Sequence, residues 1–205
     1  MWKRKRHLIL EGLDDNIPLV PYSYEVNAQG VSFYKADIKF DENGKITKIS
    51  TGAQVSLAME NIQENEIREG AFLGQGVAGS VKQGLFLPQM YPIAIKTVNI
   101  MEKEKRNQLL NDLRLFTYEK EKPEKFCPNL VQLYGAYFKD GAIKLVLELM
   151  DIGCLRDTIN MLNRIYGTKA FPENVISIIL NHILTGVNFL HKHYHIHRDI
   201  KPENI

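Results

Sequence analysis

The segment HRDIKPEN at residues 197–204 brings together three side chains that could act on a phosphoryl group. Asp199 could accept the proton of a hydroxyl, and Lys201 could neutralise charge on the transferred group. The amide oxygen of Asn204 could hold Mg²⁺, a cation that prefers oxygen ligands. Because Pro202 stops any regular element, the spacing predicts a tight loop that points all three groups toward one place.

The same region allows a different kind of site. His191, His193, His195 and His197 alternate along the sequence. On a single strand these four imidazoles would share one face and could bind Zn²⁺ or Ni²⁺. A helix predicted over 172–193 passes through the first of them, and a helix would break the alternation. We therefore favour the phosphoryl-transfer interpretation of this region.

A glycine-rich segment, LGQGVAGSV, places Gly74, Gly76 and Gly79 in the spacing G-x-G-x-x-G. Glycines let a backbone approach phosphates closely, and dinucleotide-binding folds use the same spacing just before a helix. Here SVKQGLFLP follows, and this stretch with its β-branched Val81 favours a strand. The segment is therefore predicted to be a hairpin that covers phosphates, and an ordinary glycine-rich turn is the alternative.

Lys96 ends the segment IAIK and is expected on the next strand. Side chains alternate along a strand, so Ala94 and Lys96 share a face. The small alanine would leave room for a flat ring, while the lysine would bring a positive charge toward phosphates. Asp112, on the inward side of the following helix, is the anion expected to orient this lysine. The alternatives are a solvated edge lysine and an ordinary acid on a helix surface.

Strands and helices must hold these residues in place, and the hydrophobic pattern of the sequence predicts where those elements lie. The order of elements predicts an α+β fold, in which a mainly antiparallel sheet of five strands lies beside a helical layer. The predicted strands lie within 66–87 (two strands around the glycine turn), 90–100, 129–138 and 142–151, and the predicted helices cover 102–121, 154–165 and 172–193.

Residues 1–64 differ from the rest and are interpreted as an N-terminal extension. Residues 30–50 alternate apolar and polar side chains around Asn43-Gly44, which predicts a β-hairpin. The first residues, MWKRKRHLIL, combine a basic cluster with a short apolar run.

Composition narrows the class of protein. The chain has 205 residues and a net charge of +2, which gives little support to nucleic-acid binding. Two cysteines cannot make a disulfide framework, so an intracellular, cytoplasmic setting is expected. The apolar run after the basic cluster is too short for a signal sequence, and no apolar stretch is expected to reach membrane-spanning length.

Taken together and in this order, the glycine loop, IAIK, the helix acid and HRDIKPEN resemble the eukaryotic protein kinase family over residues 66–205. Lys201 after Asp199 is similar to the serine/threonine pattern. The stretches RNQLLNDLRLF, PNLVQLYGAYF and LELMDIGCLRDTI are most similar to MAP kinase kinases. The resemblance implies a two-lobed kinase fold, with a complete N-lobe at 65–151 and the first helices of the C-lobe at 152–205.

The resemblance also implies ATP and Mg²⁺ as cofactors and assigns residues to them. Asp112 stands where most kinases have glutamate. His197 would support the catalytic loop. Two departures from MAP kinase kinases are Glu203 in KPEN and Ala78 in the glycine loop. The residues expected to contact the nucleotide are Leu73, Gly74, Gly76, Gly79, Val81, Ala94, Lys96, Asp112, the gatekeeper Leu147, and Glu148 and Met150 of the hinge.

The expected function is an ATP- and Mg²⁺-dependent serine/threonine or dual-specificity kinase that phosphorylates a MAP kinase and has its own upstream activating kinase. The alternative is a non-catalytic kinase-like binding module. Lys3–Leu10 resembles the docking peptide of MAP kinase kinases, although its cations would also suit a nuclear import signal. Because the chain ends at Ile205, before the family's DFG aspartate, it is expected to be a kinase fragment without activity of its own.

Overall fold

The computed structural model describes residues 24–27, 30–41, 43–55, 57, 59, 62–76, 79–118, 127–167 and 171–205, without the side chains of 111, 112 and 114–118. Two antiparallel sheets and three α-helices make up this part of the chain. The strands are β1 (Glu25–Asn27), β2 (Gly30–Phe33), β3 (Ile38–Asp41), β4 (Ile46–Lys48), β5 (Ile67–Gly76), β6 (Gly79–Phe86), β7 (Tyr91–Asn99), β8 (Leu133–Lys139) and β9 (Ala142–Glu148). The α-helices are α1 (Lys103–Tyr118), α2 (Leu155–Tyr166) and α3 (Glu173–Lys192), and short 3₁₀ turns are η1 (Tyr34–Ala36), η2 (Glu64–Glu66), η3 (Leu87–Gln89) and η5 (Pro202–Asn204).

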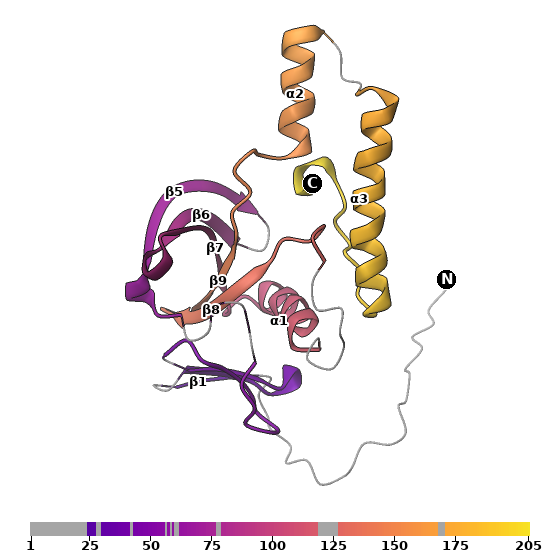
Figure 1. Cartoon of the computed structure of the whole chain (residues 1–205). Helices are drawn as coiled ribbons and strands as arrows, with labels where there is room; N and C mark the ends of the chain where they lie inside the picture. The colour runs from indigo at the N-terminus through magenta and orange to yellow at the C-terminus, as the bar shows by residue number, and fades with distance from the viewer. Residues whose placement is uncertain are drawn as a thin grey trace, which may run out of the picture.

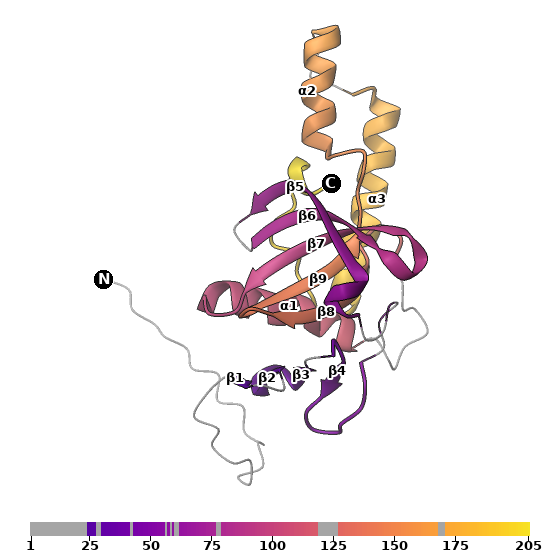
Figure 2. The same ribbon diagram turned by 90° about the vertical axis from the view of Figure 1, so that its left-hand side faces the viewer.

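The larger sheet has the strand order β5-β6-β7-β9-β8, all antiparallel. Helix α1 follows β7 in the chain and packs against one face of this sheet, since Leu109 and Leu113 share a buried core with Val98, Ile143 and other sheet residues. The five predicted strands and the inserted helix are thus confirmed, as is the α+β class. Figures 1 and 2 show α2 and α3 on one side of this N-lobe, with the C-terminal segment lying between the sheet and these helices.

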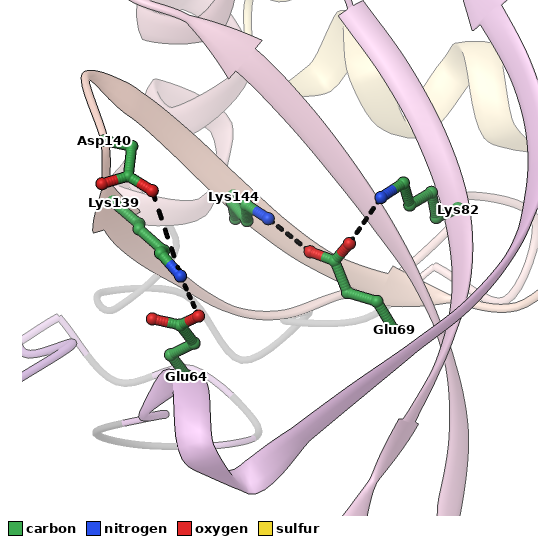
Figure 3. Close-up of polar contacts among 6 residues, drawn as sticks. All are labelled: Glu64, Glu69, Lys82, Lys139, Asp140 and Lys144. Carbon is green, nitrogen blue, oxygen red and sulfur yellow. Dashed lines mark hydrogen bonds and ion pairs between the residues drawn. The ribbon is translucent and has the colours of Figure 1, made fainter.

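The opposite face of the sheet carries a second core and a row of ion pairs. Ile93, Ile95 and Val146 belong to that core. Glu69 on β5 accepts hydrogen bonds from Lys82, at 2.7 Å, and from Lys144 on β9 (Figure 3). These two lysines lower the pKa of Glu69 to about 2. These ion pairs therefore connect the edge strand β5 to β6 and to β9 of the same sheet.

The predicted hairpin around Asn43-Gly44 is present as β3–β4, but it belongs to a larger element. β1, β2, β3 and β4 form a four-stranded antiparallel sheet, where the sequence predicted an extended segment and one hairpin. Gly44 has a φ of 74°, and a Cβ there would lie 2.0 Å from the carbonyl oxygen of Ile62, so the turn requires glycine. The strands were hard to predict because β1, β2 and β4 have only three or four residues each.

Helices α2 and α3 match their predicted ranges within one or two residues. α2 ends at Gly167, whose φ of 68° is the left-handed conformation that closes a helix. By length and composition alone, α3 could cross a membrane, with a mean hydropathy of 1.2 over its most apolar window. The expectation that no stretch reaches this length was therefore wrong by this measure, because the apolar residues of the helix raise its mean hydropathy although polar ones such as Asn181, His182 and Thr185 interrupt them.

Candidate active site

The predicted catalytic residues meet in the short loop that follows α3. The Lys201 Nζ lies 2.9 Å from Asp199 Oδ2. The Asn204 Nδ2 donates to the same Oδ2 at 2.9 Å and to the Asp199 carbonyl oxygen at 2.8 Å. The backbone N–H of Asp199 donates to His197 Nδ1 at 3.3 Å. The structure thus brings Lys201 and Asn204 to the Asp199 carboxylate, and His197 accepts a hydrogen bond from the Asp199 backbone.

Two features force the chain into this loop. Arg198 has a φ of 67°, a left-handed conformation that reverses the chain just before Asp199. Pro202 opens η5, where its missing N–H costs no hydrogen bond. The loop then contacts the start of α2, because the Leu155 N–H donates to the Ile205 carbonyl oxygen at 2.7 Å.

An ion pair adds a second connection between the loop and α2. Arg156 Nε lies 2.9 Å from Glu203 Oε1. Sequence reasoning missed this pair and treated Glu203 only as a departure from the family pattern. Nothing in the sequence marked it, because its members are 47 positions apart.

The hydrogen bonds of the loop decide which oxygens remain for a ligand. Lys201 and Asn204 both bind Asp199 Oδ2, and their hydrogen bonds lower the pKa of this carboxyl, so it stays ionised at neutral pH. Among the described residues, none donates to Asp199 Oδ1 or to Asn204 Oδ1. Within the described residues, one carboxylate oxygen and one amide oxygen therefore remain available to a ligand, and such hard oxygen ligands suit Mg²⁺.

The residues expected around a nucleotide base lie on one face of the larger sheet. Val81 on β6 is directly opposite Lys96 on β7, and Ala94 is directly opposite Leu147 on β9. Directly paired residues share a face, as do residues two apart. This is the face on which α1 packs, and Ala94 is buried there. Along β7, Lys96 therefore lies between the small Ala94 and the part of the strand that packs against α1.

The glycine segment forms the predicted hairpin between β5 and β6, in which Gly76 pairs with Gly79 and Gly74 pairs with Val81. The glycines have different reasons to be there. Gly79 has a φ of 148°, and a Cβ would lie 1.9 Å from the Thr97 carbonyl oxygen, so the fold itself requires glycine. A Cβ at Gly74 would meet nothing within 4 Å. Protein packing thus leaves open space above Gly74, which fits a backbone that approaches a ligand.

Leu73 and Met150 border this face, whereas Glu148 pairs with Ile93 and so belongs to the opposite face of the sheet. Leu73 and Met150 are half exposed. The backbone N–H of Glu148 donates to Gln132 at 3.0 Å, so this N–H is committed to the protein. Met150 follows the end of β9 and is outside the ladder.

Two parts of the expected site lie outside the described residues and side chains. Asp112 lies in α1, but its side chain is outside the described part of the chain, so its pairing with Lys96 stays a prediction. Among described side chains Lys96 has no ion-pair partner. Lys3–Leu10 also lies outside the described residues.

The alternating histidines do not form a metal site. His191 is in α3, whereas His193 is buried and its Nδ1 is 2.7 Å from the Phe189 carbonyl oxygen. His195 Nδ1 lies 2.7 Å from the His193 carbonyl oxygen. Within the described ranges, no cluster of three histidine, cysteine, aspartate or glutamate residues could hold a metal ion.

A family model of the protein kinase domain matches residues 67–205. The chain belongs to the protein kinase family. The matched range includes the glycine hairpin, Lys96 and the loop of Asp199, in the order that the resemblance implied. It also includes α3, so the apolar character of this helix is that of a helix inside a kinase domain.

Among its relatives, this kinase chain is 35% identical over 145 residues to Mitogen-activated protein kinase kinase 3 of Arabidopsis thaliana, which covers 69% of the chain and 26% of the relative. It is 28% identical over 192 residues to Mitogen-activated protein kinase kinase 1c of Physcomitrium patens, covering 90% of the chain and 52% of the relative. Cell division control protein 7 of Schizosaccharomyces pombe is 31% identical over 148 residues, with coverage of 72% and 13%. The chain thus spans about half or less of the length of these relatives.

Proposed function

We propose that the whole protein is an ATP- and Mg²⁺-dependent serine/threonine kinase of the MAP kinase kinase type, which phosphorylates a MAP kinase. The observation that carries this proposal is the loop in which Lys201 and Asn204 both bind one oxygen of Asp199 and leave the other free. A fixed carboxylate with one free oxygen can orient a substrate hydroxyl and accept its proton. A binding module without transfer would not need this arrangement.

Each part of the site has a separate task in this proposal. The open backbone at Gly74 allows the hairpin to cover phosphates, and Lys96 supplies a positive charge to them. Val81, Ala94 and Leu147 offer an apolar surface to a flat base. When bound, Mg²⁺ would neutralise phosphate charge, and Asn204 would hold it through its free amide oxygen.

Lys201 is placed to act on charge as well as on geometry. Its ammonium lies beside Asp199, which keeps the carboxylate ionised and leaves a cation next to the position of the transferred group. Phosphoryl transfer depends mainly on positioning and electrostatic stabilisation, so a preformed anion–cation pair suits it.

The substrate class rests on sequence similarity. Several relatives carry the name mitogen-activated protein kinase kinase, including the first two described above. The basic and apolar Lys3–Leu10 segment offers the charge and the leucines that a docking groove on a MAP kinase would bind.

The substrate proposal is tested by supplying the whole protein with ATP labelled at the γ-phosphate. Equal concentrations of an inactive MAP kinase and of casein, a generic substrate, are offered in separate reactions with Mg²⁺. We expect label to enter the MAP kinase at least about tenfold faster. Equal rates on both substrates would contradict the MAP kinase assignment, and no transfer to either would contradict the kinase activity.

A further inference from the structure

The N-terminal segment before the kinase match is wrapped around the N-lobe. Figures 1 and 2 show β1–β4 as a separate layer beside α1, on the side of the larger sheet that faces away from α2 and α3. From there the chain passes the β8 edge, where the Met59 N–H donates to the Tyr134 carbonyl oxygen at 2.7 Å. Ile62 then joins the core on the other face.

The N-lobe is shaped to accept this segment. Gly135 lies on β8 beneath the crossing point, and a Cβ there would be 2.3 Å from Ile62 Cδ1 and 2.9 Å from the Met59 carbonyl oxygen. Glu64 then forms an ion pair with Lys139 at the end of β8 (Figure 3). A glycine that makes room for the crossing chain indicates a specific fit rather than a loosely attached extension.

The small sheet and α1 share one hydrophobic core. A four-stranded sheet with a single apolar face must bury that face against another element. The residues of the shared core are Val31, Phe33, Ile38, Phe40, Ile46 and Val55 from the N-terminal segment, Leu109, Leu110 and Leu113 from α1, and Val98, Ile100, Leu133, Ala136, Ile143 and Leu145 from the larger sheet and its flank.

A line of rings and one cation connects the first turns of α1 to the interior of the small sheet. The Arg106 guanidinium on α1 lies 4.2 Å from the centre of the Tyr24 ring. Tyr24 stacks on Phe33 at 6.1 Å, and Phe33 meets Phe40 edge to face at the same distance. Arg106 is only 8% exposed and also donates to the Ile100 carbonyl oxygen at 2.6 Å. A buried guanidinium that is satisfied by both segments fixes their relative position.

We propose that Tyr24 and the sheet β1–β4 form a positioning device for α1, the helix that bears Asp112. The sheet precedes the residues that match the kinase-domain model, since that match begins at residue 67. The expected effect of this sheet on catalysis rests on the proposed kinase function. In that function α1 carries Asp112, the anion expected beside Lys96. The relative from Physcomitrium patens supports a shared element, since a match covering 90% of this chain includes most of residues 1–66.

The test compares matched tyrosine variants of the 205-residue chain by amide hydrogen exchange without nucleotide. Tyr24→Ala removes the ring against Arg106, whereas Tyr24→Phe keeps the ring and loses only the hydroxyl contact to Met101 Sδ at 3.8 Å. Tyr34→Ala, in η1 between β2 and β3, is the control, because the Tyr34 hydroxyl binds Glu25 instead. We expect exchange of the 107–118 amides to rise at least about tenfold in Tyr24→Ala and less than about threefold in the other two variants.

A second measurement uses the whole protein and separates positioning from simple loss of stability. In Tyr24→Ala, kcat should fall at least about fivefold while KM for ATP changes less than about twofold, and Tyr24→Phe should restore kcat. The proposal would be overturned if the amides of β7 and β9 exchanged faster by the same factor as α1, or if kcat were unchanged. If the unmodified whole protein transferred no phosphate, the proposed kinase function would fail, and the exchange measurement alone would still decide whether the sheet holds α1.

Discussion

Arg156 on α2 lies 2.9 Å from Glu203, four residues after Asp199, and so connects a helix of the C-lobe to the catalytic loop. The pair is half exposed, and exposed ion pairs contribute little to global stability because water screens them. Its effect is local, because Glu203 lies in η5, between the two residues that bind the Asp199 carboxylate.

Arg156→Ala should therefore loosen the loop without unfolding the chain. We expect amide exchange of residues 199–205 to rise about threefold, and Glu203→Gln should do the same. The double variant should show no further increase, since either change alone removes the pair. Arg164→Ala on the same helix is the control, and an equal effect of that variant would show that the loop responds to charge in general.

Gly74 and Gly79, at the two sides of the hairpin, should respond differently to alanine. Gly79→Ala places a Cβ against the Thr97 carbonyl oxygen at a φ of 148°, so it should destabilise the chain by more than about 2 kcal/mol. Gly74→Ala meets open space and should change stability by less than about 0.5 kcal/mol. It should still weaken binding of a fluorescent ATP analogue about tenfold, because the methyl occupies the space left for phosphates.

Thermal denaturation and nucleotide titration of both variants check this pair of predictions. If Gly74→Ala bound the analogue as tightly as the unmodified chain, the hairpin would be an ordinary glycine-rich turn rather than a phosphate cover.

Acid should weaken the fold through Glu69. Hydrogen bonds from Lys144 and Lys82 lower the pKa of this carboxyl from 4.5 to about 2 in the folded chain. The unfolded chain therefore binds a proton at Glu69 at higher pH than the folded chain does. The contribution of Glu69 is complete above pH 4.5 and is lost as the pH falls toward 2.

Denaturant unfolding at pH 5 and at pH 2.5 measures this loss. Glu69→Gln should lack it, so the unmodified chain should lose about 1 kcal/mol more than the variant over this range, a size that allows for solvent around the pair. Parallel losses in the two proteins would mean that the lysines do not stabilise the carboxylate.

The proposed docking role of the N-terminal segment can be tested with a peptide alone. A peptide of residues 1–16 should bind a MAP kinase, and its affinity should fall as salt rises, because Lys3, Arg4, Lys5 and Arg6 meet an acidic surface. Leu8 and Leu10 share a face in an extended peptide, so replacing both with alanine should remove most of the affinity. Isothermal titration of the two peptides measures the difference. Equal binding would leave the cations acting alone, as in an import signal.

The site could be predicted from the sequence because its signals are local. Gly74–Lys96 lies on consecutive strands, and the residues around Asp199 lie within one loop. The contact between Ile62 and Gly135 was not predictable in this way, because it joins distant segments and depends on a glycine whose missing side chain leaves no pattern. The core that Phe33 shares with Leu109 was also not predicted, because the two residues are far apart in the sequence and each segment alone has the pattern of an ordinary amphipathic element.

The replacement of Asp199 by asparagine in the whole protein tests the proposed transfer site most directly. Asparagine keeps the size of the side chain but cannot accept the hydroxyl proton, so kcat for phosphorylation of a MAP kinase should fall at least about 100-fold. Nucleotide affinity should stay within about threefold, because binding is shared among the hairpin, Lys96 and the sheet. Full phosphorylation by the Asp199→Asn protein, at the rate of the unmodified protein, would contradict the role of this carboxylate and the function built on it.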